Sequence, residues 1–239
     1  MAQKRLNKIL AHAGLSSRRG ADKLIEEGAV KVNGKVVREL GMQCDPNVDI
    51  ITLHNQKIKG PEKKIALIVN KPRGYVCSNK RLNNEKLAID LVSNFKERMY
   101  TVGRLDRDTT GLLIITNDGE LAKKVSHPSS NLVKKYLVKV HAEVTDEHLK
   151  IIAKGTMIEG KWIRPASVKK LRRGTLTIGV KEGKKHEVRL MVEAANLEII
   201  SLSRIAIGNL HLGPLPLGGF RNLNDRDLVS LFSNEKESH

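Results

Sequence analysis

The sequence lacks most of the residue patterns on which metal centres, disulfides and membrane spans depend. Its two cysteines, Cys44 and Cys77, have no partner at paired spacing, and its eight histidines form no His-x-x-x-His pair. These absences argue against a metal site, and lone thiols are typical of the cell interior. The longest apolar runs, such as Ile65 to Val69, are far shorter than the ~20 residues that span a bilayer. With no charged and then apolar leader before residue 20, we expect a cytoplasmic protein without a signal peptide, a metal or a membrane contact.

Motifs for nucleotide cofactors and for serine nucleophiles are missing as well. The chain contains neither Gly-x-Gly-x-x-Gly nor Gly-x-Ser-x-Gly. The segment from Gly155 to Lys161 has the spacing of a phosphate loop, but Trp162 follows where that motif requires Ser or Thr. No strong strand precedes this segment, so we predict a hairpin turn there. The sequence therefore predicts no cofactor.

What the sequence has in excess is positive charge. It contains 43 Lys and Arg against 26 Asp and Glu, which gives a formal net charge of +17 over 239 residues. Such a surplus indicates a polyanionic partner, most often nucleic acid, with general surface basicity as the alternative. The length allows one or two domains with a real core.

The first 62 residues read as a small domain followed by a linker. Apolar residues at helical spacing predict a helix from Leu6 to Ala13, and Ser16 or Ser17 can cap a second helix that ends at Gly28. Residues 29–37 predict a hairpin with Asn-Gly at its tip. Residues 57–64 are charged and include Gly60-Pro61, which is typical of a linker. We therefore assign residues 1–62 to one domain with its linker and residues 63–239 to another.

Several cations of the first domain are candidates for binding RNA. Arg18 and Arg19 fall in the first turn of the second helix, where the positive end of the helix already favours phosphate. Lys8 on the first helix and Lys31 on the hairpin extend the predicted patch. The alternative for each of these residues is a solvated surface position.

The second domain reads as α+β with mainly antiparallel strands. It opens with an apolar strand, and a loop that presents Lys71 and Arg73 follows. Alternation predicts a strand through Tyr136. The remaining predicted elements are a helix over 146–153, strands over 162–180, an amphipathic helix over 182–196, short strands near 199, 205–208 and 210–213, and disorder from Ser233 onward.

The stretch from Tyr100 to Ala122 is the one around which we organise this domain. Arg104 and Arg107 flank Asp106, and an apolar run from Leu112 to Ile115 follows as a buried strand. Nearby cations favour the ionised form of a carboxyl group. An ionised aspartate is a workable nucleophile or base, whereas a surface ion-pair cluster is the alternative for these residues.

Ordered motifs along most of the chain carry a family resemblance. The segments Gly14-Leu-Ser-Ser-Arg-Arg-Gly-Ala and Gly28-Ala-Val-Lys-Val-Asn-Gly resemble the S4 RNA-binding domain. Gly103-Arg-Leu-Asp-Arg-Asp-Thr-Thr-Gly-Leu-Leu resembles the signature of pseudouridine synthases, and Asn70-Lys-Pro-Arg-Gly, Lys134-Lys-Tyr and Glu182-Gly-Lys-Lys-His-Glu-Val-Arg add to it. The branch most similar is that of the S4-bearing ribosomal RNA enzymes of the RsuA/RluB type. The resemblance implies an N-terminal S4 module and a catalytic domain with a mainly antiparallel mixed sheet.

The resemblance also implies roles for particular residues. Asp106 matches the nucleophile that attacks a flipped-out uridine, Tyr136 the residue that packs on the uracil ring, and Arg189 the partner of the carboxylate. Arg104 matches the residue that fills the gap left by the extruded nucleotide. Without the resemblance, Tyr136 could equally be a buried strand aromatic and Arg189 an ordinary surface cation.

The sequence departs from the family pattern at two positions. Glu187 stands where Gln is common, and Leu190 replaces a frequent arginine. These changes bear on the choice of target more than on the chemistry. The expected partner is ribosomal RNA or a ribosomal precursor particle, and we expect a monomer. The alternative function is that of a non-catalytic S4-type RNA-binding or ribosome-assembly protein.

Overall fold

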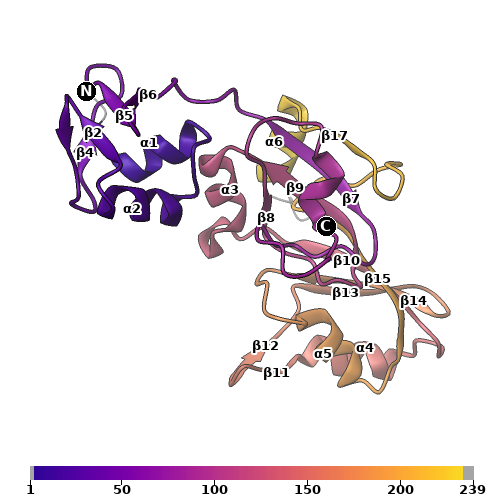
Figure 1. The fold of residues 1–239 in the computed structure, drawn as a ribbon. Helices are drawn as coiled ribbons and strands as arrows, with labels where there is room; N and C mark the ends of the chain where they lie inside the picture. Colours follow the sequence, from indigo (N-terminus) through magenta and orange to yellow (C-terminus); the bar gives the residue numbers. More distant parts are fainter. Residues whose placement is uncertain (1–2, 234–239) are drawn as a thin grey trace. The chain divides into compact units, whose positions relative to one another are not determined.

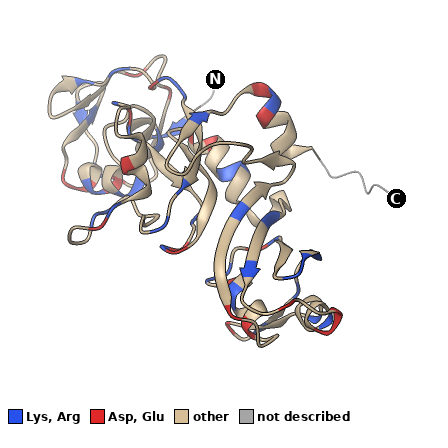
Figure 2. Cartoon of the chain, turned by 90° about the vertical axis from the view of Figure 1, so that its right-hand side faces the viewer, with Lys and Arg blue, Asp and Glu red and all other residues tan. Residues whose placement is uncertain are grey.

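A computed structural model describes residues 3–233, and the contacts divide the chain into two compact units (Figure 1). The first unit extends to Lys64 and includes Lys96–Arg98 and Asn117–Gly119. The second contains Ile65–Phe95, Met99–Thr116 and the chain from Glu120 onward. The predicted disorder beyond Ser233 lies outside the described residues. Figure 2 shows lysine and arginine spread over helices, strands and loops of both units.

The first unit packs two short helices beside small sheets. Its elements are α1 (Leu6–His12), α2 (Arg18–Glu26), the strand pair β1 (Lys4–Arg5) and β4 (Gln43–Cys44), and a sheet of order β3-β2-β5-β6 with β2 (Val30–Val32), β3 (Lys35–Val36), β5 (Ile51–Leu53) and β6 (Gln56–Lys57). Ser17 Oγ accepts the Gly20 N–H at 3.0 Å and so caps α2, as predicted. Asn33 and Gly34 have φ values of 51° and 80°, which the two-residue turn between β2 and β3 requires. The helix–helix–hairpin prediction is confirmed.

The second unit is built on a nine-stranded mixed sheet. The strand order is β13-β14-β10-β15-β9-β7-β17, with β16 on β15 and β8 on β9. The strands are β7 (Ala66–Lys71), β8 (Tyr100–Val102), β9 (Thr110–Thr116), β10 (Lys134–Val140), β13 (Ser167–Arg172), β14 (Thr175–Val180), β15 (Ile199–Ile207), β16 (Leu210–His211) and β17 (Phe220–Asn222). The pair of β9 with β15 is parallel and every other pair in this sheet is antiparallel. This confirms the α+β prediction.

Helices and a separate hairpin complete the second unit. The helices are α3 (Gly119–Ser126), α4 (Asp146–Lys154), α5 (Glu187–Glu193) and α6 (Asp225–Phe232), with the 3-10 segments η1 (Ala88–Val92) and η2 (Pro128–Ser130). The strands β11 (Thr156–Ile158) and β12 (Lys161–Ile163) pair as a hairpin. Glu159 and Gly160 adopt positive φ at its tip, so the hairpin predicted in place of a phosphate loop is confirmed. No helix between residues 3 and 233 is long and apolar enough to cross a membrane.

Two sequence predictions are wrong in extent. The helix predicted over 182–196 is confined to α5, because His186 takes a left-handed conformation (φ 56°) and residues before it form a loop. The short strands predicted after residue 199 are mostly one nine-residue strand, β15. Its polar positions break the apolar pattern, yet β15 pairs with β10 over nearly its whole length, and that pairing keeps it extended.

The parallel contact at the centre of the sheet depends on a glycine. Gly111 on β9 lies opposite Arg204 on β15 and has φ 105°. A Cβ at this position would come within 2.2 Å of the Arg204 carbonyl oxygen. Only two residue pairs join the strands before they diverge. Both pairs lie at the start of β9, so the loop before β9 lies next to the point where β9 and β15 separate.

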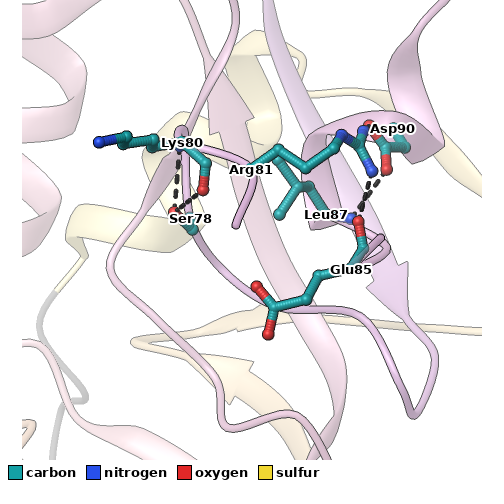
Figure 3. A network of polar contacts seen from close by, with 6 residues as sticks. All are labelled: Ser78, Lys80, Arg81, Glu85, Leu87 and Asp90. Carbon is teal, nitrogen blue, oxygen red and sulfur yellow. Dashed lines mark hydrogen bonds and ion pairs between the residues drawn. The ribbon is translucent and has the colours of Figure 1, made fainter. Parts of the chain in front are cut away.

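Side-chain hydrogen bonds order the loop that follows β7 (Figure 3). Arg81 pairs with Asp90 at 2.6 Å and also donates to the Glu85 carbonyl, while Asp90 accepts the Leu87 N–H at 2.8 Å. Burial alone would raise the pKa of Asp90, but these hydrogen bonds outweigh it and lower the pKa. Ser78 and Lys80 close a local turn by two further hydrogen bonds. These contacts order the loop, and its Cys77 accepts a hydrogen bond from Leu105 in the loop before β9.

Candidate active site

The loop over residues 103–109, between β8 and β9, carries Asp106 and is anchored at both sides of it. Leu105 and Thr109 are buried, with 5% and 1% of their surfaces exposed, while Asp106 between them is half-buried. The Leu105 N–H donates to Cys77 Sγ at 3.3 Å, and the Thr109 N–H closes a turn on the Asp106 carbonyl at 3.1 Å. Burial raises the pKa of the Cys77 thiol. The backbone therefore fixes the position of the carboxylate.

Lys71 supports the same loop from inside the fold. Its side chain is fully buried at the end of β7, and Nζ donates to the carbonyls of Pro72 (3.0 Å) and Arg107 (3.3 Å). The Gly74 N–H donates to the same Arg107 carbonyl at 2.9 Å. Burial lowers the pKa of Lys71, against the opposing effect of nearby groups that include Asp106. The prediction that Lys71 is presented to RNA is wrong, because its ammonium group is used to hold the loop.

The charge partners of Asp106 come from the segment at the start of α5. Arg189 Nε lies 3.7 Å from Asp106 Oδ2, and His186 Nε2 lies 3.6 Å from Oδ1. These side chains are 31% and 48% exposed, and that of Asp106 is 37% exposed. The sequence neighbours Arg104 and Arg107 are exposed instead. The tertiary structure therefore supplies the side chains that face Asp106 from a segment remote in sequence.

Arg189 is itself oriented by a second contact. Its Nη2 donates to Thr109 Oγ1 at 3.2 Å, while its Nε faces the Asp106 carboxylate. One guanidinium group therefore bridges two side chains of the loop that carries Asp106. Its planar fork of donors suits this geometry, which a lysine could not reproduce.

A cavity of about 750 Å³ opens above these residues. It is lined by residues that the sequence motifs singled out, Arg104, Asp106, Tyr136 and Arg189. Tyr136 on β10 is half-buried and packs against two apolar clusters. One cluster includes residues of β10, β14 and α5, and the other includes residues of β7, β9 and η1. The volume lies in the range of sites for small organic groups.

Ionisable groups in low-dielectric surroundings form a second part of the cavity wall. Glu187, only 4% exposed, accepts the Lys184 N–H at 3.2 Å, and burial raises its pKa. Lys134 Nζ donates to the Lys181 carbonyl at 2.6 Å, and burial lowers its pKa. Arg204 is 4% exposed, and its Nε donates to the Leu112 carbonyl at 2.8 Å. This wall presents polar groups to whatever enters the cavity.

Comparisons with known proteins agree with this geometry. Residues 65–194 match the family of RNA pseudouridylate synthases, and residues 4–50 match the S4 domain. A protein of Aquifex aeolicus named as an uncharacterized RNA pseudouridine synthase is 41% identical over 97% of this chain and 95% of its own. The chain belongs to the RNA pseudouridylate synthase family.

Two further matches cover nearly the full length of this synthase. The ribosomal large subunit pseudouridine synthase B of Bacillus subtilis is 37% identical, with 95% of each chain covered. A crystal structure of a pseudouridylate synthase matches with a TM-score of 0.68 and 29% identity over 95% of this chain and 99% of its own. The synthase is thus an isomerase with an N-terminal S4 domain.

Sequence reasoning about the synthase missed His186, Thr109 and Arg204 at the site. His186 and Arg189 are three residues apart, and this spacing at a helix start could have suggested a shared face toward the aspartate. Thr109 stands out in the sequence only as part of a motif, although a hydroxyl near a buried strand is a good acceptor for a guanidinium group. Arg204 carries no local signal, because its burial follows from the pairing of β15 with β9.

The candidate RNA-binding cations differ in their surroundings. Arg18 and Arg19 are exposed in the first turn of α2, whereas Lys8 and Lys31 are half-buried. Arg73 is exposed, and its Nη2 donates to the Ile200 carbonyl at 2.8 Å. An RNA-binding role for these five residues stays a prediction.

Proposed function

We propose that this synthase converts a specific uridine of ribosomal RNA to pseudouridine, with Asp106 as the nucleophile on a flipped-out nucleotide. The choice of ribosomal RNA is supported by the name of the Bacillus subtilis relative, a ribosomal large subunit pseudouridine synthase, and by the net charge of +17. A bacterial relative of this kind also supports a cytoplasmic location.

The observation that carries the proposal is the placement of Asp106. Its backbone is held by the contacts of Leu105 and Thr109, and its carboxylate faces Arg189 and His186 at the cavity. A carboxyl group held in place at a cavity is the arrangement that attack on a bound substrate requires.

The reaction breaks the bond between the ribose C1′ and the uracil N1 and forms a bond between C1′ and C5. The proton on C5 leaves to water, and N1 gains one, so substrate and product are isomers. The detached base must turn within the site before it rejoins the ribose. A cavity of about 750 Å³ gives a uracil ring room to do so.

The target nucleotide must leave its stack before Asp106 can reach it. Unstacking costs about a few kcal/mol, which contacts to the displaced strand can offset. Arg104 is exposed at the cavity, where it can occupy the space that the nucleotide leaves. Tyr136 lines the same cavity and offers a ring face for the extruded uracil.

Docking of the RNA is assigned to the S4 domain. Arg18 and Arg19 are exposed at the N-terminal end of α2, where backbone N–H groups and the helix dipole also favour phosphate. We propose that this surface holds folded RNA while the second unit performs the isomerisation.

The test uses ribosomal RNA transcripts that carry tritium at uracil C5. The purified protein alone should release tritium to water, because the C5 proton is lost in the reaction. Asp106→Asn should abolish release, whereas Asp108→Asn, which changes an exposed carboxylate of the same loop, should leave it nearly unchanged. Equal release by wild type and Asp106→Asn would refute the assignment of the nucleophile.

A further inference from the structure

The hairpin of β11 and β12 exposes an apolar pair on one face. Met157 and Trp162 lie directly opposite each other, and 56% and 51% of their surfaces are exposed. Ile158 and Ile163, on the other face, are buried in the core that α5 shares. Trp162 is the only tryptophan of the chain. The two side chains together form an apolar patch that a flat group could cover.

The indole of Trp162 is held in a fixed orientation. Its Nε1 donates to the Lys154 carbonyl at the end of α4, at 2.9 Å. The polar atom of the side chain is therefore satisfied by the protein, and half of the side-chain surface remains open. A preorganised aromatic face of this kind costs little conformational entropy when a flat group stacks on it.

The charges around the hairpin favour RNA as the partner. Lys154, whose carbonyl accepts the indole N–H, and Arg164, two residues after Trp162, are both exposed. Arg164 comes directly after the last residue of β12, and its Cγ would lie 2.9 Å from a Cβ added at Gly155, which directly follows α4. The one acid of the hairpin, Glu159, is already paired with Lys184 at 3.3 Å. An aromatic ring among cations is the usual surface for an unpaired nucleotide.

The hairpin is also connected to the active-site cavity. Lys184, the partner of Glu159 at the hairpin tip, lines that cavity. β11 packs against α5, the helix that carries Arg189, and Figure 1 shows the hairpin beside this helix. A nucleotide strand that enters the cavity would therefore pass near the hairpin.

We propose that the β11–β12 hairpin binds the RNA strand next to the target uridine, with one unpaired base stacked on Trp162 and the adjacent phosphates on Lys154 and Arg164. The proposal rests on the proposed function, because it assumes that RNA occupies the cavity. It adds a contact outside the cavity that selects targets with an unpaired neighbouring base.

The single tryptophan makes a direct test possible. Indole fluorescence of full-length Asp106→Asn reports on Trp162 alone, and this variant can be titrated with a single-stranded oligouridylate and with an RNA duplex of equal length. The single strand should quench the emission at saturation, and the duplex should quench it much less. Unchanged emission with bound oligouridylate would overturn the proposal.

Kinetics on tritiated ribosomal RNA provide the second measurement. Trp162→Ala should raise KM about tenfold with little change in kcat, since a stacked base contributes binding. Trp162→Phe also lacks the bond to the Lys154 carbonyl but keeps an aromatic face, so it should recover most of the loss. Val229→Ala removes a similarly exposed apolar side chain on α6 and should not change KM.

The outcomes separate this proposal from the proposed function. An active wild type whose Trp162→Ala variant has unchanged KM would overturn the hairpin proposal and leave the isomerase assignment intact. If Trp162→Ala weakens binding to a ribosomal precursor particle but not to naked RNA, the hairpin binds protein and the proposal is wrong. An inactive wild type whose indole emission is still quenched would instead count against the proposed function.

Discussion

The two walls of the cavity are held in different ways. The wall that carries Asp106 is fixed by backbone hydrogen bonds to Cys77, Gly74 and the buried Lys71. The opposite wall, at the start of α5, reaches the carboxylate through half-exposed side chains at 3.6 and 3.7 Å. Asp106, the proposed nucleophile, is thus positioned by the fold itself, whereas each side chain that faces it can be altered by a single substitution. This difference predicts where a change will affect stability and where it will affect chemistry.

The largest effect on the first wall should come from Gly111→Ala. The added Cβ would lie 2.2 Å from the Arg204 carbonyl oxygen at φ 105°, so β9 or β15 must move. We expect a loss of about 3 kcal/mol or more in the free energy of unfolding, measured by urea denaturation. Gly103→Ala is the matched control, because its φ is 73° with open space around the new Cβ. It should cost about 1–2 kcal/mol, and equal losses would contradict the close approach at Gly111.

Substitutions at the contact between Arg189 on the second wall and Thr109 on the first should affect activity more than stability. Arg189→Lys keeps the charge but cannot face Asp106 and Thr109 together, so we expect turnover to fall about 10- to 100-fold with the urea midpoint nearly unchanged. Thr109→Val removes one of the two contacts and should cost less, and Thr109→Ser should restore it. Steady-state tritium release measures all three. A Thr109→Val loss that serine does not restore would indicate packing rather than the hydrogen bond.

The stability of the second wall should depend on pH through Glu187. Its pKa is raised in the folded state, mainly by burial, with Glu182 adding to the rise and Lys134 and Lys184 opposing it. The folded protein therefore binds this proton more tightly than the unfolded chain, so its contribution is present at low pH and is lost as pH rises through the folded pKa. Relative to wild type, Glu187→Gln should gain about 1 kcal/mol of stability near pH 8 and almost none near pH 4. A difference in urea midpoint that does not change with pH would refute this account.

The smallest expected effect concerns the S4 domain, outside both walls. The double variant Arg18→Ala/Arg19→Ala should weaken RNA binding several-fold and make its salt dependence shallower by roughly 0.7–0.9 for each phosphate that the variant no longer neutralises. Filter binding at a series of salt concentrations measures both. Lys150→Ala/Arg226→Ala removes two exposed cations of the second unit and should have a smaller effect. Identical salt slopes for the two double variants would argue against a docking role for this end of α2.

Much of the local structure could be predicted from the sequence, because turn and cap chemistry acts over a few residues. The Ser17 cap, the Asn33-Gly34 turn and the Glu159-Gly160 turn follow from the conformations that these residues favour. The strand that follows Asp106 was also predictable from its apolar run. The length of β15 and the late start of α5 were not, since a partner strand and a left-handed His186 decide them.

The sequence by itself determined which chain segments form the candidate site: a loop with a carboxylate before a buried strand, a basic helix start and the ordered motifs around them. Only the tertiary structure decided which charged groups meet that carboxylate. It buried Lys71 beneath the loop and brought His186 and Arg189 to Asp106. It also left Trp162 on the open face of a hairpin. Charge and hydrophobicity at a position are local, but burial and pairing depend on segments far apart in the chain, and the sheet fixes those distances.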